Sequence, residues 1–185
     1  AMKCELCPRR CGADRAKTPG FCGMGEQLKV ARAALHYWEE PCISGESGSG
    51  TVFFSGCTLG CVFCQNRDIS AGGFGKEIDT ARLREIFREL IAAGANNINL
   101  VSPTQFTPQI LAALDEPPAV PVVWNTGGYE RVETLRTLEG KVQIYLPDLK
   151  YVSPELSCRY SGAADYFETA SLAILEMYRQ TGPYR

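Results

Sequence analysis

The sequence is poor in the features that mark several classes of protein. It has 1 histidine among 185 residues, His36. A lone histidine beside aromatic residues is more often structural than catalytic, although a role in proton transfer or substrate binding stays open. Lysine and arginine number 19 against 21 aspartates and glutamates, which gives a net charge of −2. Without clustered positive charge, we expect binding neither to nucleic acid nor to an anionic membrane surface.

Long apolar runs are also missing. No stretch approaches the ~20 apolar residues that a membrane-spanning helix needs. The first residues, AMKCELC, lack the apolar core of a secretory signal peptide. We therefore predict a protein that neither spans a membrane nor is secreted, and we place it in the cytoplasm.

Cysteine, in contrast, is abundant. The chain has 9 cysteines, and seven of them fall into two tight groups. An odd number of thiols spaced two or three residues apart, without a secretion signal, argues against a disulfide framework and indicates metal ligands. The first group is Cys4, Cys7, Cys11 and Cys22, and the second is Cys57, Cys61 and Cys64.

The chain divides into two segments of different character. Residues 1–49 are rich in glycine and proline turns, and we predict a loop-rich, cysteine-rich appendage. In residues 50–185, apolar strand patterns alternate with helical patterns, which predicts an α/β domain with a parallel sheet. The expected strands are 51–56, 97–102, 119–125 and 141–147, and the expected helices are 78–94, 107–114, 129–138 and a long interrupted stretch to Gln180.

Polar residues follow each expected strand. In parallel α/β folds ligands bind at the carboxyl ends of the strands, so these residues are candidates for one site. Each also has a plainer interpretation: a surface ion pair for Asp148 and Lys150, and turn chemistry for Asn125. The candidates after the four strands are Cys57, Thr104, Asn125, and Asp148 with Lys150.

The three cysteines at 57, 61 and 64 have the spacing C-x3-C-x2-C. A short glycine-containing loop with three thiolates can bind three corners of a 4Fe–4S cluster. Four protein ligands would close such a cluster, whereas three leave one iron open to another ligand.

This motif, with Phe63 as an aromatic residue before the last cysteine, resembles the signature of the radical S-adenosylmethionine (SAM) superfamily. The resemblance implies a partial (β/α)6 barrel, a 4Fe–4S cluster on Cys57, Cys61 and Cys64, and SAM as cosubstrate with Phe63 near its adenine. Reductive cleavage of SAM to a 5′-deoxyadenosyl radical is the implied reaction. Further motifs resemble an uncharacterised branch similar to pyruvate formate-lyase activating enzyme: CELCPRRCG (4–12), HYWEEPCISG (36–45), GCTLGCVFCQN (56–66), NTGGYE (125–130) and YLPDLKY (145–151).

Two segments depart from the pattern of that superfamily. Ser102-Pro103-Thr104 stands where Gly-Gly-Glu often holds the methionine amino group, and Thr104 is the nearest substitute. Asn125-Thr126-Gly127-Gly128 replaces an Asp-Thr-Asn-Gly that helps hold a monovalent cation in activating enzymes. Asp148-Leu149-Lys150 matches the activating-enzyme pattern, which implies a contact between Lys150 and the SAM carboxylate.

The first cysteine group has the spacing C-x2-C-x3-C-x10-C. Four thiolates at such spacing suit either tetrahedral zinc or a second iron–sulfur cluster, and the sequence leaves both open.

The resemblance implies a radical SAM enzyme that abstracts hydrogen from a protein or peptide, with a glycyl-radical enzyme as substrate. It also implies an electron donor of flavodoxin or ferredoxin type. Two alternatives stay open: radical chemistry on a small molecule or another macromolecule, and a non-enzymatic zinc-binding interaction module.

Only four strands are expected where the resemblance implies six. We therefore expect a partial barrel that is truncated at its carboxyl end and that cleaves SAM poorly by itself. The exposed edge of strand 141–147 would otherwise need another chain or segment to cover it.

Overall fold

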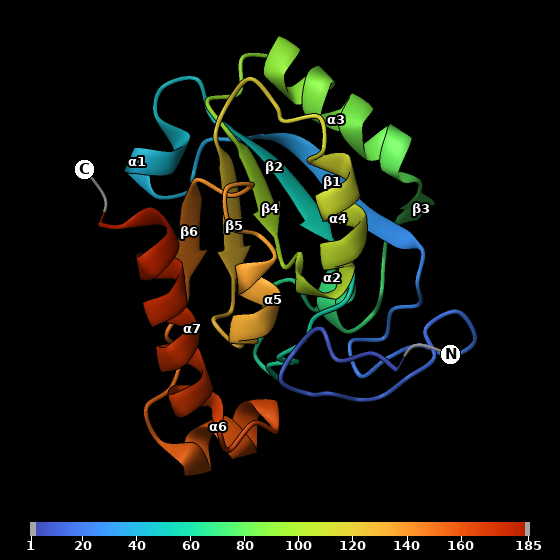
Figure 1. Ribbon diagram of the computed structural model, residues 1–185, viewed down its shortest axis with the longest axis vertical. Helices are drawn as coiled ribbons and strands as arrows, with labels where there is room; N and C mark the ends of the chain where they lie inside the picture. The colour runs from blue at the N-terminus through green and yellow to red at the C-terminus, as the bar shows by residue number, and fades with distance from the viewer. Residues whose placement is uncertain (1–2, 184–185) are drawn as a thin grey trace.

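A computed structural model of the protein describes residues 3–183, so the outermost residues of both predicted segments lie outside the described part. The fold is α/β, with one six-stranded sheet in the order β3-β1-β2-β4-β5-β6 (Figure 1). The sheet does not close on itself, because β3 and β6 are its two edges.

The four expected parallel strands are confirmed, with shifted bounds. They lie side by side in chain order, which is the arrangement that consecutive βαβ units produce. The register pairs Val52 with Leu100, Leu100 with Trp124, and Trp124 with Tyr145. An open sheet of this kind agrees with the predicted partial barrel. The strands are β2 (Ser49–Phe54), β4 (Ile98–Val101), β5 (Val122–Thr126) and β6 (Ile144–Pro147).

The expectation of loop structure through residue 49 is wrong for residues 28–36. These form β1 (Leu28–His36), which pairs antiparallel with β2 on one side and with β3 (Lys76–Ile78) on the other. Leu28 and Val30 are buried on alternate positions, a period-two pattern that predicts a strand. Strand β1 thus joins the sheet of the second segment, and the division at residue 49 stays a prediction.

Helices cover one face of the sheet (Figure 1). The predicted helix over 78–94 begins at Thr80, because the Asp79 side chain accepts a hydrogen bond from the Arg82 N–H at 2.7 Å and so caps it. The covering helices are α3 (Thr80–Ala92), α4 (Thr107–Ala113), α5 (Val132–Arg136) and α7 (Tyr166–Thr181). The remaining elements are α1 (Pro41–Ser44), α2 (Arg67–Ser70), the 3-10 turn η1 (Thr104–Phe106) and α6 (Pro154–Ser161).

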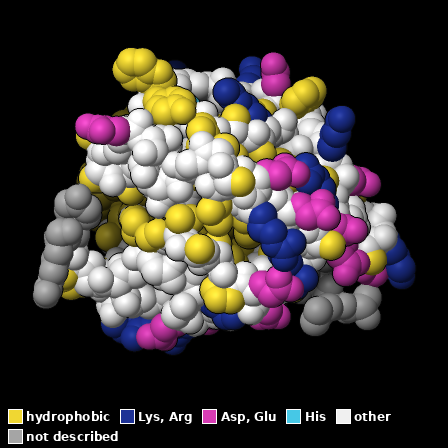
Figure 2. Space-filling view, turned by 90° about the horizontal axis from the view of Figure 1, so that it is seen from above, with side chains coloured by type: hydrophobic (Ala, Val, Ile, Leu, Met, Phe, Trp, Pro, Cys, Tyr) yellow, Lys and Arg dark blue, Asp and Glu magenta, His cyan; other side chains and the backbone are white. Residues whose placement is uncertain are grey.

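The core lies between this helical layer and the sheet. Phe54, Leu100 and Trp124 are fully buried and come from three neighbouring strands. Seen from above, charged side chains gather on the side of α3, while hydrophobic side chains line a hollow in the left half of the view (Figure 2). No helix among residues 3–183 is long and apolar enough to cross a membrane.

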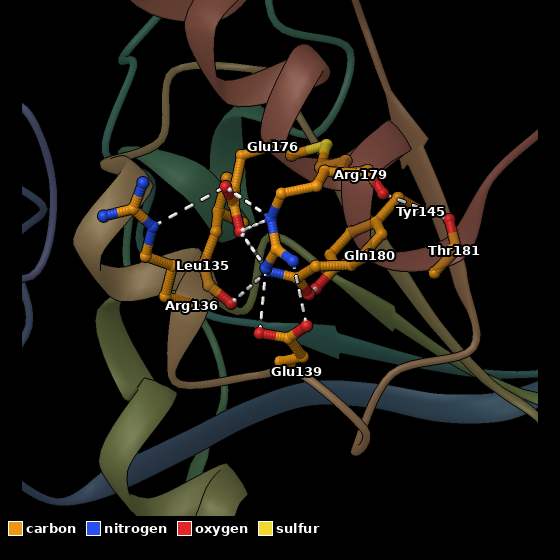
Figure 3. Close-up of polar contacts among 9 residues, drawn as sticks. Leu135, Arg136, Glu139, Tyr145, Glu176, Arg179, Gln180 and Thr181 are labelled. Atoms are coloured by element: carbon orange, nitrogen blue, oxygen red, sulfur yellow. Dashed lines mark hydrogen bonds and ion pairs between the residues drawn. The ribbon is translucent and has the colours of Figure 1, made fainter.

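The carboxyl end of α7 is joined to α5 by ionic contacts (Figure 3). The buried Glu176 carboxylate accepts hydrogen bonds from Arg179 and from Gln180, and lies 3.6 Å from the Arg136 guanidinium. Arg179 also bonds Glu139, which follows α5. Hydrogen bonds from Arg179 and Gln180 lower the pKa of Glu176 to about 2.

We predict that Glu176→Gln lowers the melting temperature at pH 7, because it removes the charged acceptor of this network. A depressed folded-state pKa means that the carboxylate contributes stability above its ordinary pKa of 4.5 and loses it as the pH falls toward about 2. The difference between wild type and variant should therefore shrink from pH 5 to pH 2. Thermal melts over that range test this, and a constant difference would contradict it.

Candidate functional site

The three cysteines of the second group lie together on the loop that follows β2. We call residues 57–64 the cluster loop. The three thiols are half-buried and form no disulfide. Gly56, at φ 81°, leads into the loop, and a Cβ there would meet the Cys22 carbonyl oxygen at 2.6 Å. Glycine is therefore required where the N-terminal segment crosses the start of the loop.

Hydrogen-bond donors surround the three sulfurs. The Leu59 N–H lies 3.4 Å from the Cys57 Sγ. The Ser161 hydroxyl donates to the Cys61 Sγ at 3.2 Å, and the Ser70 hydroxyl donates to the Cys64 Sγ at 3.4 Å. Such donors stabilise thiolates and tune the potential of any cluster that they hold.

Burial raises the pKa of the Cys57 thiol, and the neighbouring Cys61 and Cys64 raise it further. A cationic ligand would stabilise the deprotonated form of these neighbouring thiols, and its binding would release their protons. Among residues 3–183, no group of three or more histidine, cysteine, aspartate or glutamate side chains surrounds the position of a single metal ion. In an iron–sulfur cube each thiolate binds a different iron, so the three ligands of this loop need not meet at one point.

The loop after β4 is held against the start of the cluster loop. The buried Gln105 amide donates to the Ser55 carbonyl at 2.8 Å and to the Gly56 carbonyl at 3.2 Å. Ser102, at the end of β4, has φ 53°, a left-handed conformation uncommon for serine. Gln105 follows an expected strand, but the sequence gives no sign of these contacts, and no role was predicted for it.

The loops after β5 and β6 meet beside the cluster loop. The Tyr166 hydroxyl donates to the Gly127 carbonyl at 2.8 Å and accepts from the Lys150 N–H at 2.9 Å. A Cβ on Gly127 would lie 3.3 Å from Leu59 Cδ2 and 3.8 Å from Lys150 Cε. Lys150 thus lies near the cluster loop. Its ammonium is paired with Asp148 at 2.5 Å, the ion pair that was the plainer interpretation of these two residues.

Phe63 is 55% exposed. Its ring packs edge-on against Tyr151 and Tyr160, with centroids 6.2 Å apart in both pairs. The ring is therefore accessible at the rim of the cluster loop, and its predicted contact with adenine stays a prediction.

Thr104 and Asn125 point to partners that sequence analysis missed. The buried Thr104 hydroxyl donates to Glu130 Oε1 at 2.5 Å, as does the Thr126 hydroxyl. The Asn125 amide donates to Glu39 Oε2 at 3.2 Å, and the Asn99 amide donates to the same oxygen at 2.6 Å. These hydrogen bonds do not bring Thr104 or Asn125 into contact with the cysteines. The predicted contacts of both residues with SAM stay predictions.

Thiols of the N-terminal cysteine group also lie near one another, although among residues 3–183 they do not surround one metal position. A Cβ on Gly20 would lie 3.3 Å from the Cys11 Sγ and 3.6 Å from the Cys22 Sγ. The Cys4 N–H donates to the Ala13 carbonyl and the Gly12 N–H donates to the Cys4 carbonyl, both at 3.0 Å, so Cys4 lies beside the turn after Cys11. Burial raises the pKa of Cys7, and the charges of Cys22 and Cys4 raise it further. The segment lies at the end of the sheet where the parallel strands finish (Figure 1). The two cysteine groups therefore share one end of the fold.

The family assignment follows from this arrangement and from sequence comparison. Residues 51–182 match the Radical SAM superfamily. This chain is a member of that superfamily. An uncharacterised protein of Methanocaldococcus jannaschii is 34% identical over 178 residues, which cover 89% of this chain and 50% of that protein. The chain thus spans about half the length of this curated relative. Membership implies a 4Fe–4S cluster and SAM, and the cluster loop of this radical SAM domain provides thiols that fit the cluster.

Glu130 is the most buried charged residue of the site, and it joins the loops after β4 and β5. Its Oε1 accepts from two threonines, and its Oε2 is buried without a hydrogen bond among residues 3–183. Burial raises its pKa. The sequence offers a weak signal for it, the Glu at the end of NTGGYE, which looks like an ordinary surface residue after a turn.

We predict that Glu130→Ala lowers the free energy of unfolding by about 2–4 kcal/mol, because buried hydroxyl groups lose their acceptor. Glu130→Gln keeps an acceptor oxygen and should cost less. A raised folded-state pKa makes the contribution of Glu130 full at low pH and smaller as the pH rises through that pKa. The Gln variant should therefore gain stability relative to wild type as the pH rises above the ordinary glutamate pKa of 4.5. Urea titrations measure both effects, and equal losses for Ala and Gln would contradict the hydrogen-bonding role.

Proposed function

We propose that this chain carries the SAM-cleaving site of a radical SAM enzyme, with Cys57, Cys61 and Cys64 as the ligands of a 4Fe–4S cluster. The observation that carries the proposal is the cluster loop itself: three thiols on one short loop at the carboxyl end of β2, each beside an N–H or hydroxyl donor. A cluster held there would supply the electron that cleaves SAM. The protein would orient SAM and exclude water around it.

We place SAM across the carboxyl ends of β2, β4, β5 and β6. Phe63 is accessible at the rim and suits a planar base. Lys150, with Asp148 beside it, lies close to Leu59 and would face the carboxylate. Asn125 and Thr104 would act near the methionyl or ribose groups, from the loops that Glu39 and Glu130 hold.

For the substrate, we propose a protein or peptide, as in glycyl-radical activating enzymes. Exposed apolar side chains around the cluster loop support this class, because such patches commonly mark protein contacts. Val62 is 63% exposed, Leu149 52% and Val152 68%. We propose a flavodoxin- or ferredoxin-type protein as electron donor and the cytoplasm as location. A small molecule or another macromolecule remains the alternative substrate.

We propose that the N-terminal cysteine group is a second metal centre, either an iron–sulfur cluster or zinc. Its four protein ligands would be Cys4, Cys7, Cys11 and Cys22. Its support is the approach of the Cys11 and Cys22 sulfurs to Gly20, together with the backbone hydrogen bonds that hold Cys4 beside Gly12 and Ala13. With four protein ligands it would have no open position for SAM.

The cluster assignment is tested by alanine replacement in anaerobically reconstituted protein. Cys61→Ala should abolish formation of 5′-deoxyadenosine and the change that SAM causes in the EPR spectrum of the reduced cluster. Cys158→Ala is the matched control, because it removes an exposed thiol on α6 that hydrogen-bonds none of the cluster-loop residues among residues 3–183, and it should behave as wild type. SAM cleavage by Cys61→Ala at the wild-type rate would refute the assignment.

The second centre is tested by metal content. Replacing Cys4 and Cys22 together should remove one metal centre per chain while the EPR response to SAM persists. Cys42→Ala, another exposed cysteine, serves as control. If iron, zinc and sulfide per chain all stay at the wild-type amounts, the four N-terminal thiols are not ligands.

A further inference from the structure

Arg9 belongs to the N-terminal cysteine group by sequence but to the cluster loop by its contacts. Between Cys7 and Cys11 in the chain, its side chain donates from Nε to the Thr58 carbonyl at 3.0 Å and from Nη2 to the Leu59 carbonyl at 2.9 Å. The same guanidinium donates to the carbonyls of Ser161, at 2.6 Å, and Gly162. One cation thus joins two backbone segments about a hundred residues apart.

Two aromatic rings hold this guanidinium in place. The Arg9 Cζ lies 4.1 Å from the centroid of the Phe21 ring and 5.1 Å from that of Tyr129. Only arginine has a planar fork of five N–H donors that can reach several carbonyls at once while stacking on rings. The next residue, Arg10, is exposed, and its side chain makes no hydrogen bond to residues 3–183.

Two of the four residues whose carbonyls Arg9 binds also contact sulfurs of the cluster loop. Leu59 directs its N–H to Cys57 Sγ, and Ser161 directs its hydroxyl to Cys61 Sγ. The turn that carries Arg9 is closed by a hydrogen bond from the Arg10 N–H to the Cys7 carbonyl at 3.0 Å. A continuous set of contacts therefore runs from the backbone turn at Cys7 through Arg9 to two of the three cluster-loop thiols.

We propose that Arg9 is a positioning residue through which metal binding at the N-terminal cysteine group fixes the shape of the cluster loop. This inference rests on the proposed function only for the presence of the two metal centres. Metal bound to Cys7 and Cys11 restrains the turn that carries Arg9, and the guanidinium passes that restraint to the two segments that it bridges. The N-terminal centre then acts by holding the cluster loop, without any contact of its own with SAM.

The first test is hydrogen–deuterium exchange in the metal-free chain. Arg9→Ala should speed exchange about tenfold in residues 57–64 and 160–163, because bonds that close these segments are lost, while β4 and β5 stay protected. Arg9→Lys should resemble Arg9→Ala, since an ammonium lacks the fork. Arg10→Ala is the control for loss of a neighbouring positive charge, and its exchange rates in both segments should match those of wild type.

The second test isolates the coupling between the two cysteine groups. In a chain with Cys57, Cys61 and Cys64 replaced by alanine, loading with zinc, or with iron and sulfide, should slow exchange in residues 57–64. Adding Arg9→Ala should abolish that response and leave metal uptake by the N-terminal group unchanged.

Unchanged exchange in Arg9→Ala, or wild-type protection in Arg9→Lys, would overturn the positioning role. A loop response to metal that persists without Arg9 would overturn the coupling. The metal-free comparison gives a result even where no metal binds, so failure of this inference and failure of the proposed function are distinguishable. Circular dichroism of each variant separates local opening from general unfolding.

Discussion

The parallel register of β2, β4, β5 and β6 is the constraint on which the site depends. It brings four loops to one end of the sheet, where their backbones must be held at short range without the regular bonds of a strand. Single side chains do this: Gln105 joins the loops after β2 and β4, and Tyr166 joins those after β5 and β6. The cysteines occupy positions that these contacts define.

Two acidic side chains, the buried Glu130 and the half-buried Glu39, also join neighbouring segments. Glu130 accepts from Thr104 in η1 and from Thr126 at the end of β5, and Glu39 accepts from asparagines on β4 and β5. Burying a carboxylate is costly unless several donors compensate it, so such residues are expected where loop positions matter more than stability. Glu130 contacts Thr104 and Glu39 contacts Asn125, the residues that we place near SAM. The two carboxylates would affect SAM only through these residues.

Much of the fold and the centre of the site followed from the sequence, because local patterns decide them. The apolar strands and the amphipathic α3 follow from periodicity, and the spacing of Cys57, Cys61 and Cys64 places three thiols on one loop. Strand β1 was missed because glycine and proline on either side of it suggested loops, although its pairing with β2 needs only the alternation at Leu28 and Val30. Contacts between distant segments were the hardest to predict. Arg9, Glu39 and Glu130 differ in no local way from surface residues, and their roles depend on tertiary approach over long separations in the chain.

The central claim is that Cys57, Cys61 and Cys64 hold a cluster with one iron open to SAM. Mössbauer spectroscopy of 57Fe-reconstituted protein tests it most directly, in a chain whose Cys4 and Cys22 are replaced so that one centre remains. The account predicts that SAM shifts the signal of one iron in four and leaves the other three unchanged. Four iron signals that do not respond to SAM, or no cluster at all in that chain, would contradict it.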